Sequence, residues 1–277
     1  MFAGVDIGSL VTKAVVLGDN KIVGYAIVNS RIEPGKAGEQ ALEQAIIKSG
    51  CSSKDIEYIV ATGYGRNSFS IANKSITELT CHATGAHYLN PKIRTVIDIG
   101  GQDSKVIKLD ENGKMVDFAM NDKCAAGTGR FLEVMANALE VKLEDMGKVS
   151  LGANKPCLLS TTCTVFAETE VISLIASGAG KENIIAGLSE SVARRVGSMA
   201  KSLGVQEKVV FVGGVAKNTG VKKALEEYLG IKFVVNSIDP QINGALGAAI
   251  LAAEMKEIKP TKPPVLSLNS TNVKLPL

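Results

Sequence analysis

A short motif occurs twice in this chain, each time directly after a run of apolar residues. The first copy reads Asp-Ile-Gly-Ser at 6–9, and the second reads Asp-Ile-Gly-Gly at 98–101. In both cases a second strand-like segment follows, at 12–17 or at 104–109, and its second residue is a lysine. One such tripeptide is typical of an ordinary turn. Its recurrence 92 residues later in the same setting indicates an internal duplication.

The residue types in the duplicated hairpin are suited to holding phosphate. Glycine at the turn lets backbone N–H groups approach an anion, and the aspartate can hold a hydrated divalent cation that bridges phosphate oxygens. Two such loops facing each other would clamp one nucleotide. A third glycine turn, Gly213-Gly214, ends the apolar run 209–212, and residues 218–220 then open a further helix. We expect this turn to lie against a nucleoside.

Length and composition favour a globular protein with two lobes. The chain has 277 residues, of which 45% are hydrophobic and 21% are charged. This length suits two lobes of about 100 to 150 residues each. The formal net charge is only +3, which predicts neither a nucleic-acid partner nor a membrane partner. No run of 18 apolar residues and no basic leader before an apolar stretch occurs, so we expect a cytoplasmic protein.

Hydrophobic periodicity predicts the same layered unit twice. Three strands, a helix and a further strand make a mixed α/β layer. For the first lobe we expect strands at 3–7, 12–17, 21–28 and 56–61, with a helix at 38–49 that Gly50 caps. For the second lobe we expect strands at 95–99, 105–109, 115–120 and 208–212, with helices that include 188–203 and 221–229. We expect a helix of small residues at 244–255 to pack between the lobes.

The five cysteines form no C-x-x-C pair, which argues against a disulfide framework and against a zinc ribbon. Cys124 and Cys163 each fall where a strand passes into a helix, a position that favours a thiolate. Two thiolates are half of an all-cysteine iron-sulfur site, and a twofold homodimer would supply the other half. The alternative is that both are small buried residues. Cys51, Cys81 and Cys157 lack this setting, and we expect no ligand role for them.

The order of the two Asp-x-Gly loops and the later Gly-Gly turn resembles the superfamily of actin, the sugar kinases and the heat-shock ATPases. This resemblance implies a duplicated actin-like ATPase fold of the α/β class, with ATP and Mg²⁺ in a cleft between two lobes that hinge. We expect the first lobe at 1–92, completed by the C-terminal helix, the second lobe at 93–258, and a flexible tail at 259–277.

A more specific resemblance is carried by the segments around Cys124 and Cys163, together with 60–66, 95–103 and 213–218. These segments are similar to the ATP-dependent activators of 2-hydroxyacyl-CoA dehydratases, relatives of the benzoyl-CoA reductase ATPase subunits, over residues 1–256. The resemblance implies an anaerobic, cytoplasmic homodimer in which each subunit binds ATP or ADP with Mg²⁺. It also implies one bridging 4Fe-4S cluster, and an electron taken from ferredoxin or flavodoxin and passed to a dehydratase or a related reductase.

The same resemblance implies roles for individual residues. Cys124 and Cys163 match the cluster ligands, Asp6 and Asp98 would act through Mg²⁺ and its waters, and Gln102 would orient the attacking water, so that Asp98 and Gln102 are the catalytic candidates. The residues expected to contact phosphates are Gly8, Ser9, Thr12, Lys13, Gly100, Gly101 and Gln102, and those expected to contact the nucleoside are Gly213, Gly214 and Asn218.

Some features of the chain leave alternatives open. Leu10-Val11 stands where relatives carry small or polar residues, which either tightens packing behind the first loop or weakens its bonding to phosphate. Arg66 is a partner-facing charge or a solvated loop arginine, and Glu168 is not assigned as a base. A small-molecule kinase of the same fold without a cluster is the main alternative function, and a nucleotide-gated assembly factor is a third.

Overall fold

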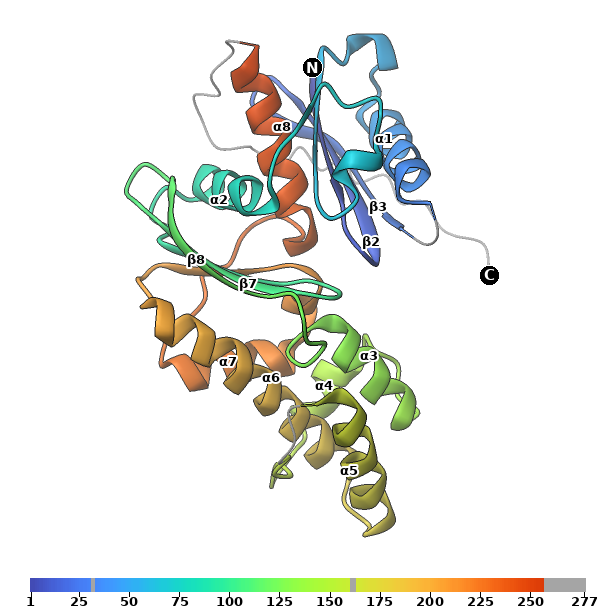
Figure 1. Ribbon diagram of the computed structural model, residues 1–277, viewed down its shortest axis with the longest axis vertical. Coiled ribbons are helices and arrows are strands. Elements are labelled where there is room, and N and C mark those ends of the chain that lie inside the picture. Colours follow the sequence, from blue (N-terminus) through green and yellow to red (C-terminus); the bar gives the residue numbers. More distant parts are fainter. Residues whose placement is uncertain (31–32, 160–162, 257–277) are drawn as a thin grey trace.

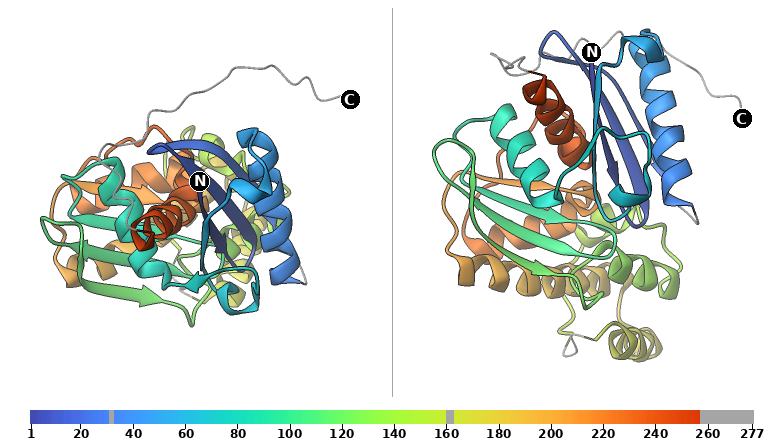
Figure 2. Two further views of the ribbon diagram at one scale, coloured as in Figure 1. Left: turned by 90° about the horizontal axis from the view of Figure 1, so that it is seen from above. Right: turned by 45° about the horizontal axis from the view of Figure 1, so that its top comes forward.

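The chain folds into two lobes that lie one above the other along the long axis of the molecule (Figure 1). The computed structural model describes residues 1–30, 33–159 and 163–256, so the tail expected at 259–277 lies outside the described residues. Each lobe contains one mixed sheet with helices on both faces (Figures 1 and 2). In this described part of the chain no helix is both long enough and apolar enough to span a membrane.

The sheet of the first lobe has the order β3-β2-β1-β4-β5. Its strands are β1 (Phe2–Ile7), β2 (Val11–Gly18), β3 (Lys21–Asn29), β4 (Tyr58–Thr62) and the short β5 (Lys74–Ser75). The helix α1 (Pro34–Ser49) packs on one face, where alternate side chains such as Val5 and Ile7 point. The helix α8 (Asn243–Met255) packs on the other face, so the end of the described chain completes the first sheet.

The sheet of the second lobe has the order β8-β7-β6-β9. Its strands are β6 (Thr95–Ile99), β7 (Ser104–Leu109), β8 (Met115–Asn121) and β9 (Val209–Val212). Helix α2 (Glu78–Leu89) covers one face, and α6 (Lys181–Leu203) and α7 (Thr219–Leu229) cover the other. The shorter helices α3 (Gly129–Ala138), α4 (Met146–Ser150) and α5 (Thr164–Ala176) extend this second core.

The strand registers confirm the duplication predicted from the sequence. In each lobe the motif aspartate lies opposite the lysine of the antiparallel partner strand, as Asp6 opposite Lys13 and Asp98 opposite Lys105. In each lobe the same strand also has a parallel neighbour, β4 beside β1 and β9 beside β6. Both aspartates therefore project from equivalent positions at the same end of equivalent strands.

Helices α2 and α8 cross between the two sheets, and their backbones touch (Figure 1). A Cβ atom on Gly85 would collide with the carbonyl of Asn243, and a Cβ atom on Gly247 would collide with the carbonyl of Cys81. Because glycine has no side chain, the two helices approach more closely than interlocking side chains would allow. This crossing joins the two lobes next to Asp6 and Asp98.

Most predicted elements are confirmed within one to three residues at each end, but three helices start elsewhere than expected. The helix expected at 188–203 begins seven residues earlier, at Lys181. The helix expected at 38–49 begins at Pro34, since proline is favoured in the first turn, and it ends at Gly50 in the left-handed conformation, as predicted. The helix after Cys124 begins only at Gly129, because residues 125–128 form a turn closed by the Thr128 N–H on the Ala125 carbonyl. Cys124 thus precedes the helix by a full turn.

Candidate functional site

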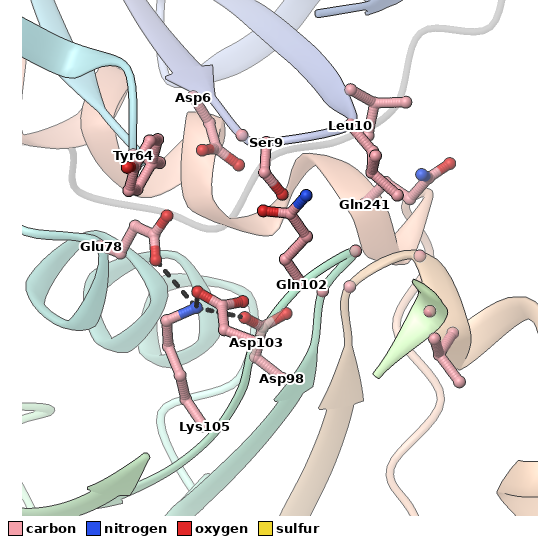
Figure 3. A pocket seen from close by; sticks show the side chains of 18 of the residues that line it. Asp6, Ser9, Leu10, Tyr64, Glu78, Asp98, Gln102, Asp103, Lys105 and Gln241 are labelled. Carbon is pink, nitrogen blue, oxygen red and sulfur yellow. Dashed lines mark hydrogen bonds and ion pairs between the residues drawn. The ribbon is translucent and has the colours of Figure 1, made fainter. Parts of the chain in front are cut away.

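A cavity of about 980 Å³ lies between the two lobes, and both duplicated loops open into it (Figure 3). It is lined from the first lobe by the loop between β1 and β2, and from the second lobe by the loop between β6 and β7 and the turn after β9. The structure therefore brings together these predicted residues: Asp6, Gly8, Ser9, Lys13, Asp98, Gly100, Gly101, Gln102, Gly213, Gly214 and Asn218.

Thr12 is the one predicted phosphate contact that does not line this cavity. Its side chain is fully buried, and its Oγ1 lies 2.8 Å from the Oγ of Ser30. Ser30 donates in turn to the carbonyl of Gly8 at 2.6 Å. Because β2 turns alternate side chains to opposite faces, Thr12 points away from the cleft and supports the glycine loop from behind.

In the first hairpin, one lysine meets one carboxylate. Lys13 Nζ lies 3.0 Å from Asp6 Oδ2, and the Lys13 side chain is 13% exposed. Burial alone would lower the pKa of Lys13, but the carboxylates of Asp6, Asp98 and Glu78 together, Asp6 foremost, outweigh it and raise the pKa. Lys13 is therefore a permanent cation at the edge of the cavity.

In the second hairpin, one lysine is shared by three carboxylates (Figure 3). Lys105 Nζ lies 2.7 Å from Asp103, 2.8 Å from Glu78 and 3.4 Å from Asp98, and its side chain is only 3% exposed. Burial lowers the pKa of Lys105, and the three carboxylates more than reverse this, so the pKa is raised.

The carboxylates around Lys105 respond in opposite directions. Burial alone would raise the pKa of Asp98, but His82, Lys105 and Lys13 lower it below its ordinary value. The pKa of Glu78 is raised, since its burial outweighs the attraction of Lys105. The surroundings therefore favour the ionised form of Asp98, whereas they disfavour the ionised form of Glu78.

Around the facing loops, carboxylates outnumber ammonium groups. The carboxylates of Asp6, Asp98, Glu78 and Asp103 share two ammonium groups, those of Lys13 and Lys105. A polyphosphate entering this region would meet net negative charge, so it needs a cation to accompany it. Oxygen ligands that leave room for water suit Mg²⁺, and Mg²⁺ bound here would neutralise charge on the phosphates. The donor set therefore fits a hydrated magnesium ion.

Two glycines occupy matching positions beside the two aspartates. Gly63 follows β4 with a φ of 90°, and Gly213 follows β9 with a φ of 87°. A Cβ atom on Gly63 would collide with the Asp6 carboxylate, and one on Gly213 would collide with the Asp98 carboxylate. Both positions therefore require glycine, for backbone conformation and for space.

The nucleoside end of the cavity is built around the start of α7. The Asn218 side chain accepts a hydrogen bond from the Val221 N–H at 3.0 Å and caps this helix. Its amide oxygen is therefore used by the helix, which leaves the NH₂ group for a ligand. Lys217 beside it donates to Asp239 and to Gln241, both at 2.6 Å, and this network holds the turn after β9 in place.

Leu10 occupies a position that the sequence left open. It does not pack behind its own loop but reaches across the cleft, so that a Cβ atom on Gly101 would lie 2.7 Å from Leu10 Cδ1. Gln102, from the second loop, is exposed and projects toward Ser9 of the first (Figure 3). The tips of the two loops therefore meet at the mouth of the cavity.

The two singled-out cysteines lie outside the cavity lining. Cys163 is exposed and is the N-cap residue of α5, which excludes the buried alternative for this thiol. It lies at a helix start as expected, but the element described before α5 is the helix α4 and not a strand. Cys124 is half-buried in the turn before α3, where the Asn121 side chain donates to the carbonyls of Cys124 and Ala126 at 2.9 and 3.0 Å. Helices α3 and α5 pack against each other.

The Cys124 segment is hydrogen-bonded directly to the second phosphate loop. The Gly129 N–H donates to the carbonyl of Gly100 at 2.9 Å, and the Arg130 N–H donates to the carbonyl of Gly101 at 2.7 Å. Any shift of this loop therefore acts on the first turn of α3, one turn beyond Cys124. Sequence analysis did not foresee this contact.

Among residues 1–30, 33–159 and 163–256, no group of three or more His, Cys, Asp or Glu side chains is arranged to hold a metal ion. Within the described part of one chain, Cys124 and Cys163 are therefore not part of a complete metal site. Cys81 is not a further candidate, because burial raises its pKa to about 12 and keeps it a thiol at neutral pH.

Sequence analysis missed several residues of the cavity. Glu78, Asp103 and Tyr64 all project into it (Figure 3), and His82 also lines it. Asp103 stands in the second motif and could have been found there, whereas α2 carries no motif that points to Glu78. Arg66 also lines the cavity and donates to the carbonyl of Gly63 at 3.0 Å, so it stabilises its own loop.

Comparison with known proteins agrees with this geometry. A model of the BadF/BadG/BcrA/BcrD ATPase family matches residues 3–252. The activator of lactoyl-CoA dehydratase of Anaerotignum propionicum is 49% identical over 258 residues, which are 92% of this chain and 98% of that protein.

Two solved structures extend the comparison to the fold. Component A of the Acidaminococcus fermentans (R)-2-hydroxyglutaryl-CoA dehydratase superposes with a TM-score of 0.89 at 46% identity, covering 92% of this chain and 98% of the other. The activator of the Clostridium difficile 2-hydroxyisocaproyl-CoA dehydratase, with bound ADPNP, gives 0.87 at 45% identity, covering 94% and 98%. The expected fold class is confirmed.

Proposed function

Because this chain belongs to the BadF/BadG/BcrA/BcrD ATPase family, we propose that it is an ATP-driven activator of a 2-hydroxyacyl-CoA dehydratase. Its relatives at 45 to 49% identity are named as activators or components of such dehydratases. The cavity supports ATP as the fuel, since both phosphate loops and a nucleoside turn line one space between the lobes. A cytoplasmic location is part of the proposal.

The finer proposal is that two chains share one 4Fe-4S cluster, held by Cys124 and Cys163 of each. Four thiolates complete an all-cysteine cluster, which carries one electron at a low potential when bound. Each chain offers one exposed thiol at the start of α5 and one half-buried thiol in the turn before α3, and these two helices pack against each other. The electron would come from ferredoxin or flavodoxin and leave to the dehydratase, while ATP is hydrolysed to ADP and phosphate.

One observation carries the coupling between ATP and the cluster. The second phosphate loop is hydrogen-bonded through the carbonyls of Gly100 and Gly101 to the start of α3, directly after the Cys124 turn. Movement of the loops upon nucleotide binding would therefore move one ligand segment. Within the loops, Asp6 and Asp98 would act through magnesium and its waters, and Gln102 would orient the attacking water.

The energy available is of the right size. Lowering a one-electron potential by about 0.2 V costs about 5 kcal/mol, because about 59 mV corresponds to a tenfold change for one electron. Coupling between two sites is typically about 1 to 3 kcal/mol, so two ATP sites would supply about 2 to 6 kcal/mol. Hydrolysis then serves mainly to make the transfer unidirectional.

Anaerobic purification tests the cluster. We expect a brown protein with about four iron and about four sulfide per dimer. Cys124→Ser and Cys163→Ser should each abolish both, whereas Cys51→Ser, at another half-buried free thiol, should keep them. A colourless wild-type protein that phosphorylates a metabolite would instead identify a kinase of the same fold.

Reconstitution tests the partner. We expect turnover of a 2-hydroxyacyl-CoA dehydratase to require this chain, ATP and reduced ferredoxin or flavodoxin together. Activation of a reductase but of no dehydratase would move the assignment to the related reductase systems. Cys51→Ser should be compared with wild type at equal iron content, so that loss of the cluster and loss of ATP coupling are separated.

A further inference from the structure

A buried histidine, His82 of α2, lies where the carboxylates of both phosphate hairpins meet. Its side chain is 6% exposed, and its Nε2 atom lies 3.7 Å from Asp98 Oδ2. A Cβ atom on Gly244 would lie 3.1 Å from His82 Nε2 and 3.2 Å from Asp6 Oδ2. Both atoms therefore border the same small space, and the Nε2 edge of the ring faces one aspartate from each lobe.

The other edge of the ring is held by Asn243, the first residue of α8. Asn243 Nδ2 lies 3.0 Å from the His82 carbonyl oxygen and 3.2 Å from His82 Nδ1. A carbonyl oxygen only accepts hydrogen bonds, so the Asn243 group that faces it must be the NH₂. The same NH₂ group faces Nδ1, which must then accept as well.

This contact determines where the ring carries its proton. With Nδ1 as the acceptor, the neutral imidazole has its N–H at Nε2, which points toward the aspartates. In metal sites, too, hydrogen-bond partners of a histidine fix the orientation of its ring, and their loss weakens metal binding. The crossing of α2 and α8 thus presents one oriented donor to Asp98 and Asp6.

We propose that His82 is a positioning residue that orients the Asp98 and Asp6 carboxylates for the magnesium ion of the nucleotide. This inference rests on the proposed ATP-driven function and adds to it a residue that belongs to neither motif. Lys105 and Lys13 compensate the charge of the two aspartates, but an ammonium group is a point charge with three equivalent donors, so it does not select one orientation of a carboxylate. A rigid ring held by Asn243 restricts it, so that one oxygen of each carboxylate stays turned toward the cavity.

The chain offers a conservative variant, a disruptive variant and a matched control. Gln places an NH₂ group close to the position of the histidine Nε2 and therefore keeps the donor in His82→Gln. His82→Leu keeps bulk but has no donor. His87 lies on the same helix, outside the cavity lining, so His87→Gln makes the same chemical change away from the site.

Electron paramagnetic resonance can measure the affinity for Mn²⁺ in the presence of ADP. This affinity depends on the orientation of the two carboxylates and requires no hydrolysis. We expect His82→Leu to weaken Mn²⁺ binding about tenfold and to lower kcat for ATP hydrolysis about tenfold. The KM for ATP at saturating Mg²⁺ should change less than threefold. His82→Gln should recover both quantities to within threefold of wild type, and His87→Gln should leave both unchanged.

Two results would overturn the proposal: equal losses in His82→Gln and His82→Leu, or wild-type Mn²⁺ affinity in His82→Leu. If His82→Leu does not fold, Asn243→Ser provides the second test. It frees Nδ1 and should weaken Mn²⁺ binding while ADP still binds without metal; unchanged Mn²⁺ binding there also overturns the proposal. Absence of ADP binding by the wild-type chain would defeat the proposed function instead.

Discussion

The two phosphate hairpins have the same backbone plan but different surroundings. In both, an aspartate lies opposite a lysine across an antiparallel pair, and a glycine with positive φ follows the neighbouring parallel strand. Lys13 of the first hairpin has one carboxylate partner and is 13% exposed. Lys105 of the second has three carboxylate partners and is 3% exposed.

From this difference we predict that Lys13 binds a ligand and that Lys105 is structural. Lys105 is fixed by Glu78 of α2 and by Asp103 of its own loop, so moving it would leave carboxylates buried without compensation. Lys13 can turn toward a phosphate and leave only Asp6 behind. The two hairpins are therefore equivalent in backbone structure. Within the described part of the chain, only the second is held in place by α2, through the ion pair between Glu78 and Lys105.

Removal of each lysine should separate the two roles most strongly. Lys105→Met should lower the free energy of unfolding by about 3 to 5 kcal/mol, because it leaves buried carboxylates unpaired. Lys13→Met should cost less, about 1 to 3 kcal/mol, but should raise the KM for ATP more. Urea unfolding and steady-state hydrolysis measure the two quantities, and equal stability losses would remove the distinction between the hairpins.

Substitution of Gly63 and Gly213 by alanine tests whether the two hairpins are also equivalent in stability and in nucleotide binding. Gly63→Ala and Gly213→Ala should each lose about 1 to 3 kcal/mol of stability, since both backbones are in conformations that favour glycine. Gly213 itself lines the cavity, whereas Gly63 borders it only through the Asp6 carboxylate, so Gly213→Ala should weaken nucleotide binding more than Gly63→Ala. Isothermal titration with ADP decides this, and equal loss of affinity in both variants would contradict it.

The contact between the loop tips should have a smaller effect. Leu10→Ser removes the apolar contact with Gly101 that joins the two hairpins, at a cost of about 1 kcal/mol. We expect the KM for ATP to rise about fivefold at most, with little change in kcat. Ile47→Ser, at an exposed site on α1 outside the cavity lining, is the control and should change neither parameter.

The pH dependence of stability should show the smallest effect, with opposite signs for two partners of Lys105. The pKa of Asp98 is lowered, so its stabilisation is complete above its ordinary pKa of 3.8 and is lost as the pH falls below it. The pKa of Glu78 is raised above 4.5, so the folded state binds its proton more tightly and loses stability as the pH rises through the folded value.

Glu78→Gln should therefore gain stability relative to wild type as the pH rises from 4.5 toward neutrality. Urea midpoints at pH 4.5 and at neutral pH measure this gain, with the exposed Glu43→Gln as a surface control. A gain in wild-type stability relative to the variant over the same interval would reverse the sign assigned to Glu78.

Much of the fold was accessible from the sequence because the strands are short, apolar and bounded by glycine. The duplicated motif also fixed the position of the loops and of the cavity between them. The start of the helix after Cys124 was misplaced because residues 125–128 close a turn that hydrophobic spacing does not reveal. The role of Thr12 was misjudged because alternation along β2 turns it from the cleft.

The less predictable part of the site comes from α2. Glu78 and His82 carry no motif, and their importance follows from where the helix crosses α8, a long-range packing property. The residues beside the glycine turns could be predicted because they are close to the motifs in sequence. That Lys105 has three carboxylate partners and Lys13 has one depends on tertiary contacts. The cysteine assignments and the catalytic pair Asp98 and Gln102 stay predictions for the experiments above.

Hydrogen exchange at the two amides that join α3 to the second loop should report whether nucleotide is bound. Since Gly129 and Arg130 donate to the carbonyls of Gly100 and Gly101, their protection from deuterium reports whether that junction is intact. Exchange at these two sites, followed during catalytic turnover, would time the arrival of the signal at the Cys124 turn without any label attached to the protein.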